Sequence, residues 1–312
     1  MTRGAATPEA LEALAAALGP EGRRSVPIGP LTTYGVGGAA ALLVTVADDD
    51  HLASVAAACA AVEEVPVLVL GLGSNLLVAD EGFAGLVVVL GPAFAAIEVQ
   101  GRRVRAGARA KLPVVARQCA AAGLAGFEWA AGVPGSIGGA VRMNAGVPDA
   151  EVSDVLVAAR VIDLATGADE VVAAEDLHLG YRTSSLADRQ VVAWAELELA
   201  PGDPAVGRSL IKEKTQWRRD NQPGGRNAGS VFTNPPGDSA GRLIDAAGCK
   251  GLRIGSAEVS TKHANFIQAD EGGRAADVWA LMAEVRRRVH AASGIVLHPE
   301  THLVGLPPVP EP

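Results

Sequence analysis

Two glycine-rich segments of the chain combine residue types that bind phosphate groups. The first, Gly71-Leu72-Gly73-Ser74-Asn75, directly follows the apolar run Val65–Leu70. Its glycines let successive backbone N–H groups converge on an anion with no Cβ atom in the way, and Ser74 and Asn75 add side-chain hydrogen bonds. A Gly-Ser-Asn turn between strands is common in proteins, so this segment alone is a weak indication of a phosphate site.

The second segment, Gly132–Gly146, strengthens that indication. It reads Gly132-Val133-Pro134-Gly135-Ser136-Ile137-Gly138-Gly139-Ala140 and ends in Met143-Asn144-Ala145-Gly146. Such a glycine-rich backbone approaches a flat or phosphorylated ligand closely, and Pro134 stiffens the loop. The two loops together predict a site for a pyrophosphate and an isoalloxazine ring.

Two other nucleotide-binding motifs are not supported. The segment Gly35-Val36-Gly37-Gly38-Ala39-Ala40 satisfies the GxGxxA pattern, but Pro30-Leu31-Thr32-Thr33 before it is not the buried strand that a Rossmann unit requires. We interpret this segment as a turn. No GxxxxGK(S/T) sequence occurs, which excludes a P-loop.

Composition limits the class of protein. With 312 residues, of which 49% are hydrophobic and 4% aromatic, the chain can bury a sizeable core and exceeds the usual size of one domain. The formal charge of −8, without a concentrated basic stretch, makes nucleic acid an unexpected partner. Arg286-Arg287-Arg288 is interpreted as the solvated face of a helix.

No metal site, disulfide or membrane segment is predicted. Cys59, Cys119 and Cys249 lie far apart and form no CxxC pair. The alanine-rich N-terminal stretch carries Glu9 and Glu12. No segment reaches about 18 uninterrupted apolar residues. Since neither an export signal nor a membrane segment is recognised, we expect the chain in the cytoplasm.

The expected order of helices and strands indicates an α+β protein. Helices are expected between Thr7 and Gly19 and at 50–61, Leu112–Ala122, Ala205–Arg219, Ser239–Ala247 and Ala275–Ala292. Strands are expected at Ala41–Val46, Val65–Leu70, Leu86–Leu90, Ala95–Val99, Arg103–Ala106, Val155–Asp163, Val191–Leu199 and Asn265–Gln268, with a final pair at Ile295–Leu297 and His302–Val304. In Val191–Leu199 the odd-numbered residues are all apolar, so that face should point inward.

The two loops and the motifs downstream of them resemble the UDP-N-acetylenolpyruvoylglucosamine reductase family. The resemblance runs from about Pro27 to Gly305. Besides the two loops it rests on Thr33-Tyr34-Gly35-Val36-Gly37-Gly38, Gly180-Tyr181-Arg182, Asn227-Ala228-Gly229-Ser230-Val231-Phe232, Ala240–Gly255, Lys262-His263-Ala264-Asn265-Phe266-Ile267 and Pro299-Glu300. The long insertion that covers the substrate in the larger branch of the family is missing, so the chain resembles the shorter type.

The resemblance implies a two-part FAD-binding domain of the vanillyl-alcohol-oxidase type followed by a smaller α/β substrate-binding domain. The turn cluster Pro201-Gly202-Asp203-Pro204 agrees with a boundary between them. The expected division is a helical extension (1–24), the FAD-binding domain (25–202, with subdomains of about 25–90 and 91–202), the substrate-binding domain (203–306) and a proline-rich tail (307–312).

The resemblance also implies an activity. It is the reduction of UDP-N-acetylglucosamine enolpyruvate to UDP-N-acetylmuramate, a peptidoglycan precursor, by NADPH through bound FAD. No His or Cys lies in either glycine loop, which favours noncovalent FAD. The residues expected to bind FAD are Gly71, Gly73, Ser74, Asn75, Leu76, Gly132, Pro134, Gly135, Ser136, Gly138, Gly139, Asn144 and Ala145.

Three residues match the family's catalytic groups. Arg182 would hold the substrate carboxylate as negative charge accumulates on it. Ser230 would donate the proton to the carbon beside that carboxylate. Glu300 would donate a hydrogen bond to the same charge if burial keeps it protonated. From the residues alone, a surface ion pair, a turn serine and an exposed acid remain the alternatives.

Asn234 and His263 fall where the family contacts its substrate, and Arg218 and Arg219 are expected partners for the UDP phosphates. Tyr181 is also expected to bind substrate. Two positions beside the site depart from the family pattern. Thr233 stands where a lysine is frequent, and His298 stands where an acid is frequent. These departures bear on substrate affinity and pH dependence.

Two other functions remain open from the sequence. One is a flavin oxidase or dehydrogenase of the same fold that acts on a different small substrate, since a fold does not determine chemistry. The other is a nucleotide-binding regulator that has lost catalysis. The presence of Arg182, Ser230 and Glu300 together argues against the regulator.

Overall fold

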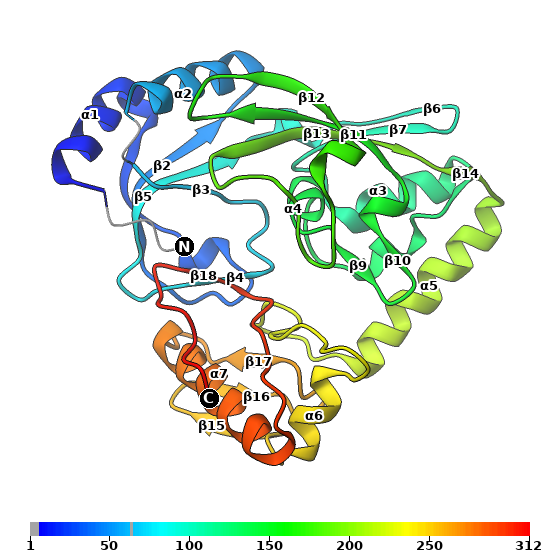
Figure 1. The fold of residues 1–312 in the computed structure, drawn as a ribbon. Coiled ribbons are helices and arrows are strands. Elements are labelled where there is room, and N and C mark those ends of the chain that lie inside the picture. The colour runs from blue at the N-terminus through cyan, green and yellow to red at the C-terminus, as the bar shows by residue number, and fades with distance from the viewer. Residues whose placement is uncertain (1–5, 63–64) are drawn as a thin grey trace.

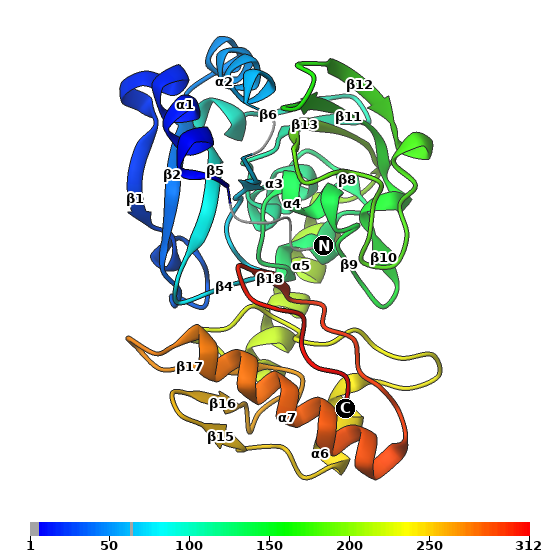
Figure 2. The same cartoon turned by 60° about the vertical axis from the view of Figure 1, so that its left-hand side comes forward.

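The first part of the chain forms a four-stranded sheet with two helices packed beside it (Figures 1 and 2). The computed structural model describes residues 6–62 and 65–312. Strands β2, β5 and β3 run parallel, and β1 pairs antiparallel with β2. Thr7 caps α1, because its side-chain oxygen accepts the backbone N–H of Ala10 (3.2 Å), and Asp48 caps α2 by accepting the backbone N–H of His51 (2.9 Å). The bounds are α1 Pro8–Leu18, β1 Arg23–Pro27, β2 Ala39–Val46, α2 Asp49–Ala61, β3 Val67–Val69 and β5 Phe83–Leu90.

A five-stranded antiparallel sheet follows, in the order β12-β11-β13-β7-β6. The predicted inward face of β13 is confirmed, because Ala193, Ala195 and Leu197 are at most 1% exposed. Residues of both sheets share one hydrophobic core. The bounds are β6 Ile97–Gln100, β7 Arg103–Gly107, α3 Leu112–Ala121, α4 Ile137–Arg142, β11 Leu156–Asp163, β12 Asp169–Ala173 and β13 Gln190–Glu198. Two short pairs lie beside this sheet: β8 (Leu124–Ala125) with β14 (Ala200–Pro201), and β9 (Gly146–Val147) with β10 (Ala150–Glu151).

The long helix α5 (Pro204–Asn221) leads from these sheets to a third region with its own hydrophobic core (Figure 1). Helix α5 packs against α3 and the short 3₁₀ helix Glu128–Gly132. Asp80 of the first part caps α7 by accepting the backbone N–H groups of Ala275 and Ala276. The bounds of the third region are α6 Ala240–Ala246, β15 Arg253–Ile254, β16 Ala257–Val259, β17 Ile267–Ala269 and α7 Ala275–Ser293. Among the helices described, none has the length and apolar character needed to cross a bilayer.

The end of the chain returns to the first part of the molecule. Strand β18 (His302–Val304) pairs in parallel with β4 (Leu76–Val78), which directly follows the first glycine loop. The predicted pairing of β18 with 295–297 is therefore wrong, and residues 295–297 form no strand. Leu297 instead packs into the core of the third region, and its carbonyl bonds to α7. The domain boundary near residue 203 stays a prediction. Strand β18 lies after that boundary in the sequence, yet it pairs with a strand of the first part of the chain.

The interpretation of all three consecutive arginines as solvated is wrong for Arg286, which is 2% exposed. Its guanidinium donates to the carbonyls of Leu297 (2.8 Å), Val309 (2.7 Å) and Pro310 (2.5 Å). It also pairs with the carboxylate of Glu311 (3.2 Å). The proline-rich tail is thus fastened to α7 by one buried cation.

Arg286→Ala is expected to lower the free energy of unfolding by about 2–4 kcal/mol, because it leaves buried carbonyls unpaired and removes packing. Arg287 is the matched control, since its guanidinium pairs with Glu284 on the helix surface. Arg287→Ala should change stability little. Urea unfolding of both variants measures the difference, and equal losses would contradict a structural role for Arg286.

Candidate active site

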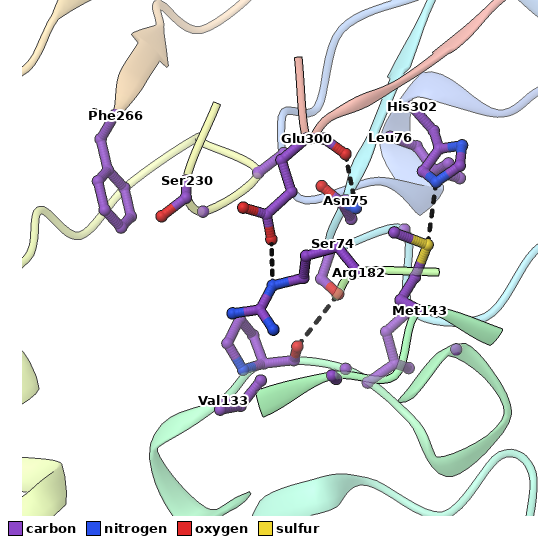
Figure 3. A pocket seen from close by; sticks show the side chains of 18 of the residues that line it. Ser74, Asn75, Leu76, Val133, Met143, Arg182, Ser230, Phe266, Glu300 and His302 are labelled. Carbon is purple, nitrogen blue, oxygen red and sulfur yellow. Dashed lines mark hydrogen bonds and ion pairs between the residues drawn. The ribbon is translucent and has the colours of Figure 1, made fainter. Parts of the chain in front are cut away.

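A cavity of about 1970 Å³ is lined by residues from all three regions (Figure 3). Both glycine loops contribute to its wall, and so do Arg182, Ser230 and Glu300. Pockets for one small ligand usually measure about 300–1,000 Å³. The cavity therefore has room for a dinucleotide and a second ligand.

The two glycine loops contact each other and leave bare backbone facing the cavity. The hydroxyl of Ser74 donates to the carbonyl of Pro134 (3.2 Å), which joins the loops. A Cβ atom on Gly71 would lie 2.8 Å from the hydroxyl oxygen of Ser136, so a side chain there would close the gap between them. At Gly132 a Cβ atom would meet no atom closer than 4.0 Å. This glycine-lined surface fits a pyrophosphate and a flat ring system.

Glu300 is tied by its backbone to the first glycine loop. The side-chain amide of Asn75 donates to the carbonyl of Glu300 (3.1 Å), and the backbone N–H of His302 donates to the carbonyl of Asn75 (3.0 Å). These bonds continue into the β18–β4 pairing. The strand return described above therefore places an acid beside the cofactor cradle.

Arg182 and Glu300 form an ion pair inside the cavity. Nε of Arg182 lies 2.9 Å from Oε1 of Glu300, and the two side chains are 19% and 16% exposed. A second guanidinium N–H donates to the carbonyl of Gly146 (2.9 Å), at the end of the second loop. Arg182 has the left-handed φ of 57°, which is uncommon outside glycine and turns its side chain back toward Glu300. Figure 3 shows the two charged groups facing each other.

Two opposing influences act on the Glu300 carboxyl. Burial raises its pKa above the ordinary value, and the neighbouring Arg182 guanidinium acts in the other direction. Burial is the larger influence, so the net direction is upward. The carboxyl is thus more easily protonated than an exposed glutamate.

Ser230 lies beside this pair (Figure 3). It follows Gly229, whose φ of 77° turns the chain into the cavity. The next residue, Val231, accepts the backbone N–H of Glu300 (2.8 Å), so the segments that carry Ser230 and Glu300 are directly joined. Within the part of the chain that the structure describes, the Ser230 hydroxyl has no hydrogen-bond partner. It is free to bond to a ligand.

Comparisons with known proteins agree with this geometry. A family model described as "FAD binding domain" matches residues 39–171, and one described as "UDP-N-acetylenolpyruvoylglucosamine reductase, C-terminal domain" matches residues 221–304. The UDP-N-acetylenolpyruvoylglucosamine reductase of Paramagnetospirillum magneticum is 45% identical over 92% of this chain and 93% of its own. The UDP-N-acetylenolpyruvoylglucosamine reductase of Acidiphilium cryptum is 46% identical over 90% of this chain and 91% of its own. The chain belongs to the UDP-N-acetylenolpyruvoylglucosamine reductase family.

A solved structure supports the same assignment. The UDP-N-acetylenolpyruvylglucosamine reductase of Thermus caldophilus aligns with a TM-score of 0.79 and 38% identity, over 90% of this chain and 98% of that one. The expected α+β fold, with an FAD-binding domain followed by a family-specific C-terminal domain, is confirmed. FAD is the cofactor of this reductase.

Most of the residues expected to bind FAD line the cavity of the reductase: Gly71, Gly73, Ser74, Asn75, Leu76, Gly132, Pro134, Gly135, Ser136, Gly139 and Ala145. Gly138 and Asn144 lie behind that wall. A Cβ atom on Gly138 would be 2.9 Å from the Cβ of Ala108, so glycine lets the loop pack closely. Asn144 is fully buried and bonds to the backbone of Gly180 and Ser153. Both residues shape the cradle, and their contact with FAD stays a prediction.

The residues expected to bind substrate in the reductase divide into two groups. Arg218, Asn234 and His263 line the cavity, whereas Tyr181 is 54% exposed and stacks its ring against the Arg182 guanidinium (4.9 Å). Burial lowers the pKa of Arg218, which has no acidic partner among the described residues. Burial, and then the charge of Lys250, lowers the pKa of His263. The Asn234 side chain accepts the N–H of Ala240 at the start of α6.

Sequence reasoning missed other residues that line the reductase cavity. One of them is His302, whose Nε2 atom is 2.9 Å from the sulfur of Met143. Burial is the main cause that lowers the pKa of His302, and the charge of Arg142 lowers it further. No sequence pattern marks His302, because its place depends on the distant pairing of β18. Lys214 lies four residues before Arg218 on α5 and could have been found from helical spacing.

Proposed function

We propose that this reductase converts UDP-N-acetylglucosamine enolpyruvate into UDP-N-acetylmuramate, with NADPH as hydride donor, in a cytoplasmic step of peptidoglycan precursor synthesis. One observation carries the proposal. The glycine-lined cradle and the group Arg182, Ser230 and Glu300 open into the same cavity. A cofactor held by the cradle and a substrate held by that group would therefore meet.

The residues that would hold FAD are those of the two glycine loops, which the bonds of Ser74 to Pro134 and of Asn75 to Glu300 hold in place. FAD held there would supply the hydride transfer, from NADPH to the terminal carbon of the enolpyruvyl double bond. The chain's own task is to hold the substrate for that transfer and to manage the charge and the proton that follow.

Arg182 and Glu300 are proposed to stabilise negative charge on the substrate carboxylate. Addition of hydride to the double bond pushes charge into that group as an enediolate. A guanidinium carries several N–H donors, and two of those on Arg182 are already fixed in place by Glu300 and Gly146. Glu300 in its protonated form donates a further hydrogen bond, which its raised pKa favours.

Ser230 is proposed to donate the proton to the carbon beside the carboxylate. A serine hydroxyl is a weak acid, but the enediolate carbon is strongly basic and the nearby Arg182 favours the alkoxide left behind. The Ser230 hydroxyl lines the cavity and has no hydrogen-bond partner among the residues described, whereas Ser74 is bonded to the neighbouring loop. Ser230 is thus available for this step.

An anaerobic titration tests the proposed function. The purified protein is expected to be yellow, to bleach on adding NADPH, and to recover its colour when UDP-N-acetylglucosamine enolpyruvate is added. Because NADPH and the enolpyruvyl substrate are added in turn, the flavin absorbance reports reduction and reoxidation as separate half-reactions. Recovery by oxygen alone, and never by the enolpyruvyl substrate, would reject the proposal in favour of another flavin oxidoreductase of this fold.

A further inference from the structure

The two residues that follow Ser230 have every backbone hydrogen-bonding group paired. Val231 donates its N–H to the carbonyl of Asn265 (2.9 Å), and its own carbonyl accepts the N–H of Glu300 (2.8 Å). The N–H and the carbonyl of Phe232 both bond to the side-chain amide of Asn265, at 3.0 and 2.8 Å. Three of these four bonds end on Asn265, which is 4% exposed.

We propose that Asn265 is a positioning residue for proton transfer, holding the backbone that carries Ser230 in place beside Glu300. The inference rests on the proposed function, in which Ser230 is the proton donor. An amide suits this position because one planar group both accepts from a backbone N–H and donates to a backbone carbonyl. Both atoms of the Asn265 amide bond to the Phe232 backbone, and Asn265 acts on proton transfer through that backbone.

The placement of the Ser230 hydroxyl depends on these bonds. Since that hydroxyl has no partner of its own within residues 6–62 and 65–312, its location is determined by the backbone on which it is carried. Val231 and Phe232 lie between Asn265 on one side and the 298–300 segment on the other: Phe232 forms a bridge with Pro299, and Thr233 donates to the carbonyl of His298 (2.9 Å). Removing the Asn265 amide frees Phe232 on that side, while the bond from the Val231 N–H to the main-chain carbonyl of Asn265 remains. A misplacement of about 1 Å can slow a reaction about 10²-fold.

Asn265 also reaches a second part of the site. Its backbone N–H donates to Nδ1 of His263 (3.3 Å), which leaves Nε2 as the ring nitrogen that carries the proton in the neutral imidazole. Asn265 therefore links the segment of Ser230 to a residue expected to contact substrate. Substitution of the Asn265 side chain leaves this backbone bond available.

The test measures the two half-reactions separately in Asn265→Asp and Asn265→Ala, each purified with FAD bound. The aspartate keeps an acceptor for the Phe232 N–H and loses the donor to its carbonyl, whereas the alanine loses both. In both variants the rate of FAD reduction by NADPH should stay within about twofold of that of the unmodified protein. The rate of reoxidation by the enolpyruvyl substrate should fall about 10-fold in Asn265→Asp and about 10²-fold in Asn265→Ala. The solvent deuterium isotope effect on reoxidation should rise, because proton transfer then limits the rate.

A double substitution provides the control. In the background of Ser230→Ala, adding Asn265→Ala should slow reoxidation less than about threefold, because the group that Asn265 positions is already gone. Equal slowing of both half-reactions by Asn265→Ala would overturn the inference. So would a double variant whose slowing of reoxidation equals the product of the two single-variant effects. If Asn265→Ala does not fold, Asn265→Asp alone decides by the same criteria. If the unmodified protein itself is never reoxidised by the enolpyruvyl substrate, the proposed function fails and the inference fails with it.

Discussion

Ser230→Ala is expected to leave reduction of FAD by NADPH nearly unchanged while slowing reoxidation by the enolpyruvyl substrate about 10²- to 10⁴-fold. The reason is that only the second half-reaction needs a proton at the carbon beside the carboxylate. Loss of one unpaired hydroxyl removes no hydrogen bond among the described residues, so the fold should be unaffected. Stopped-flow absorbance under anaerobic conditions gives both rates from one preparation.

The serine experiment has a conservative variant that separates chemistry from structure. Ser230→Cys keeps a proton donor in nearly the same place and should recover part of the lost rate, while Ser230→Ala should not. Equal damage to reduction and reoxidation in Ser230→Ala would instead assign the serine a structural role. It would leave Arg182 and Glu300 as the groups that manage the substrate.

Arg182→Lys is expected to slow reoxidation about 10²- to 10³-fold, because an ammonium group cannot keep the contacts to Glu300 and Gly146 while also facing the substrate carboxylate. Arg182→Met should be slower still. Removing the positive charge should also raise the pKa of Glu300 further, since Arg182 is the influence that opposes burial. If protonated Glu300 is the active form, the fall in reoxidation rate at high pH then moves to higher pH.

Arg160 supplies a matched control for the arginine experiment. Arg160 lies on β11, pairs with Asp169 of β12 (2.7 Å) and with Asp49 at the start of α2 (2.8 Å), and does not line the cavity. Arg160→Met also removes a partly buried cation, but it should leave both half-reactions unchanged. An unshifted pH profile in Arg182→Met would contradict the electrostatic coupling of Arg182 with Glu300.

The parts of this site that sequence could predict are those determined by local chain chemistry. The glycine loops are recognisable because close backbone approach requires glycine at particular positions, and α5 and α7 are recognisable from their length and periodicity. Strands β15 and β16 are too short to produce a periodic signal. The same limit explains why their sheet was not expected.

The contacts that assemble the site could not be predicted from local patterns. The Asn75–Glu300 bond joins residues 225 apart, and the Arg182–Glu300 pair joins residues 118 apart. Periodicity reports which face of an element is buried and not which distant element covers it. The burial of Arg286 was missed for a related reason, since its partners are tail carbonyls that no charge pattern indicates.

The return of β18 to β4 also has a consequence for synthesis of the protein. A ribosome makes the strands of both large sheets first, and such domains generally begin to fold as they emerge. The partner of β4, and Glu300 with it, leaves the ribosome only after the strands of both large sheets. A nascent chain can therefore form much of its FAD-binding framework early, yet its active site is complete only after Glu300 and β18 have emerged and paired with the first part of the chain.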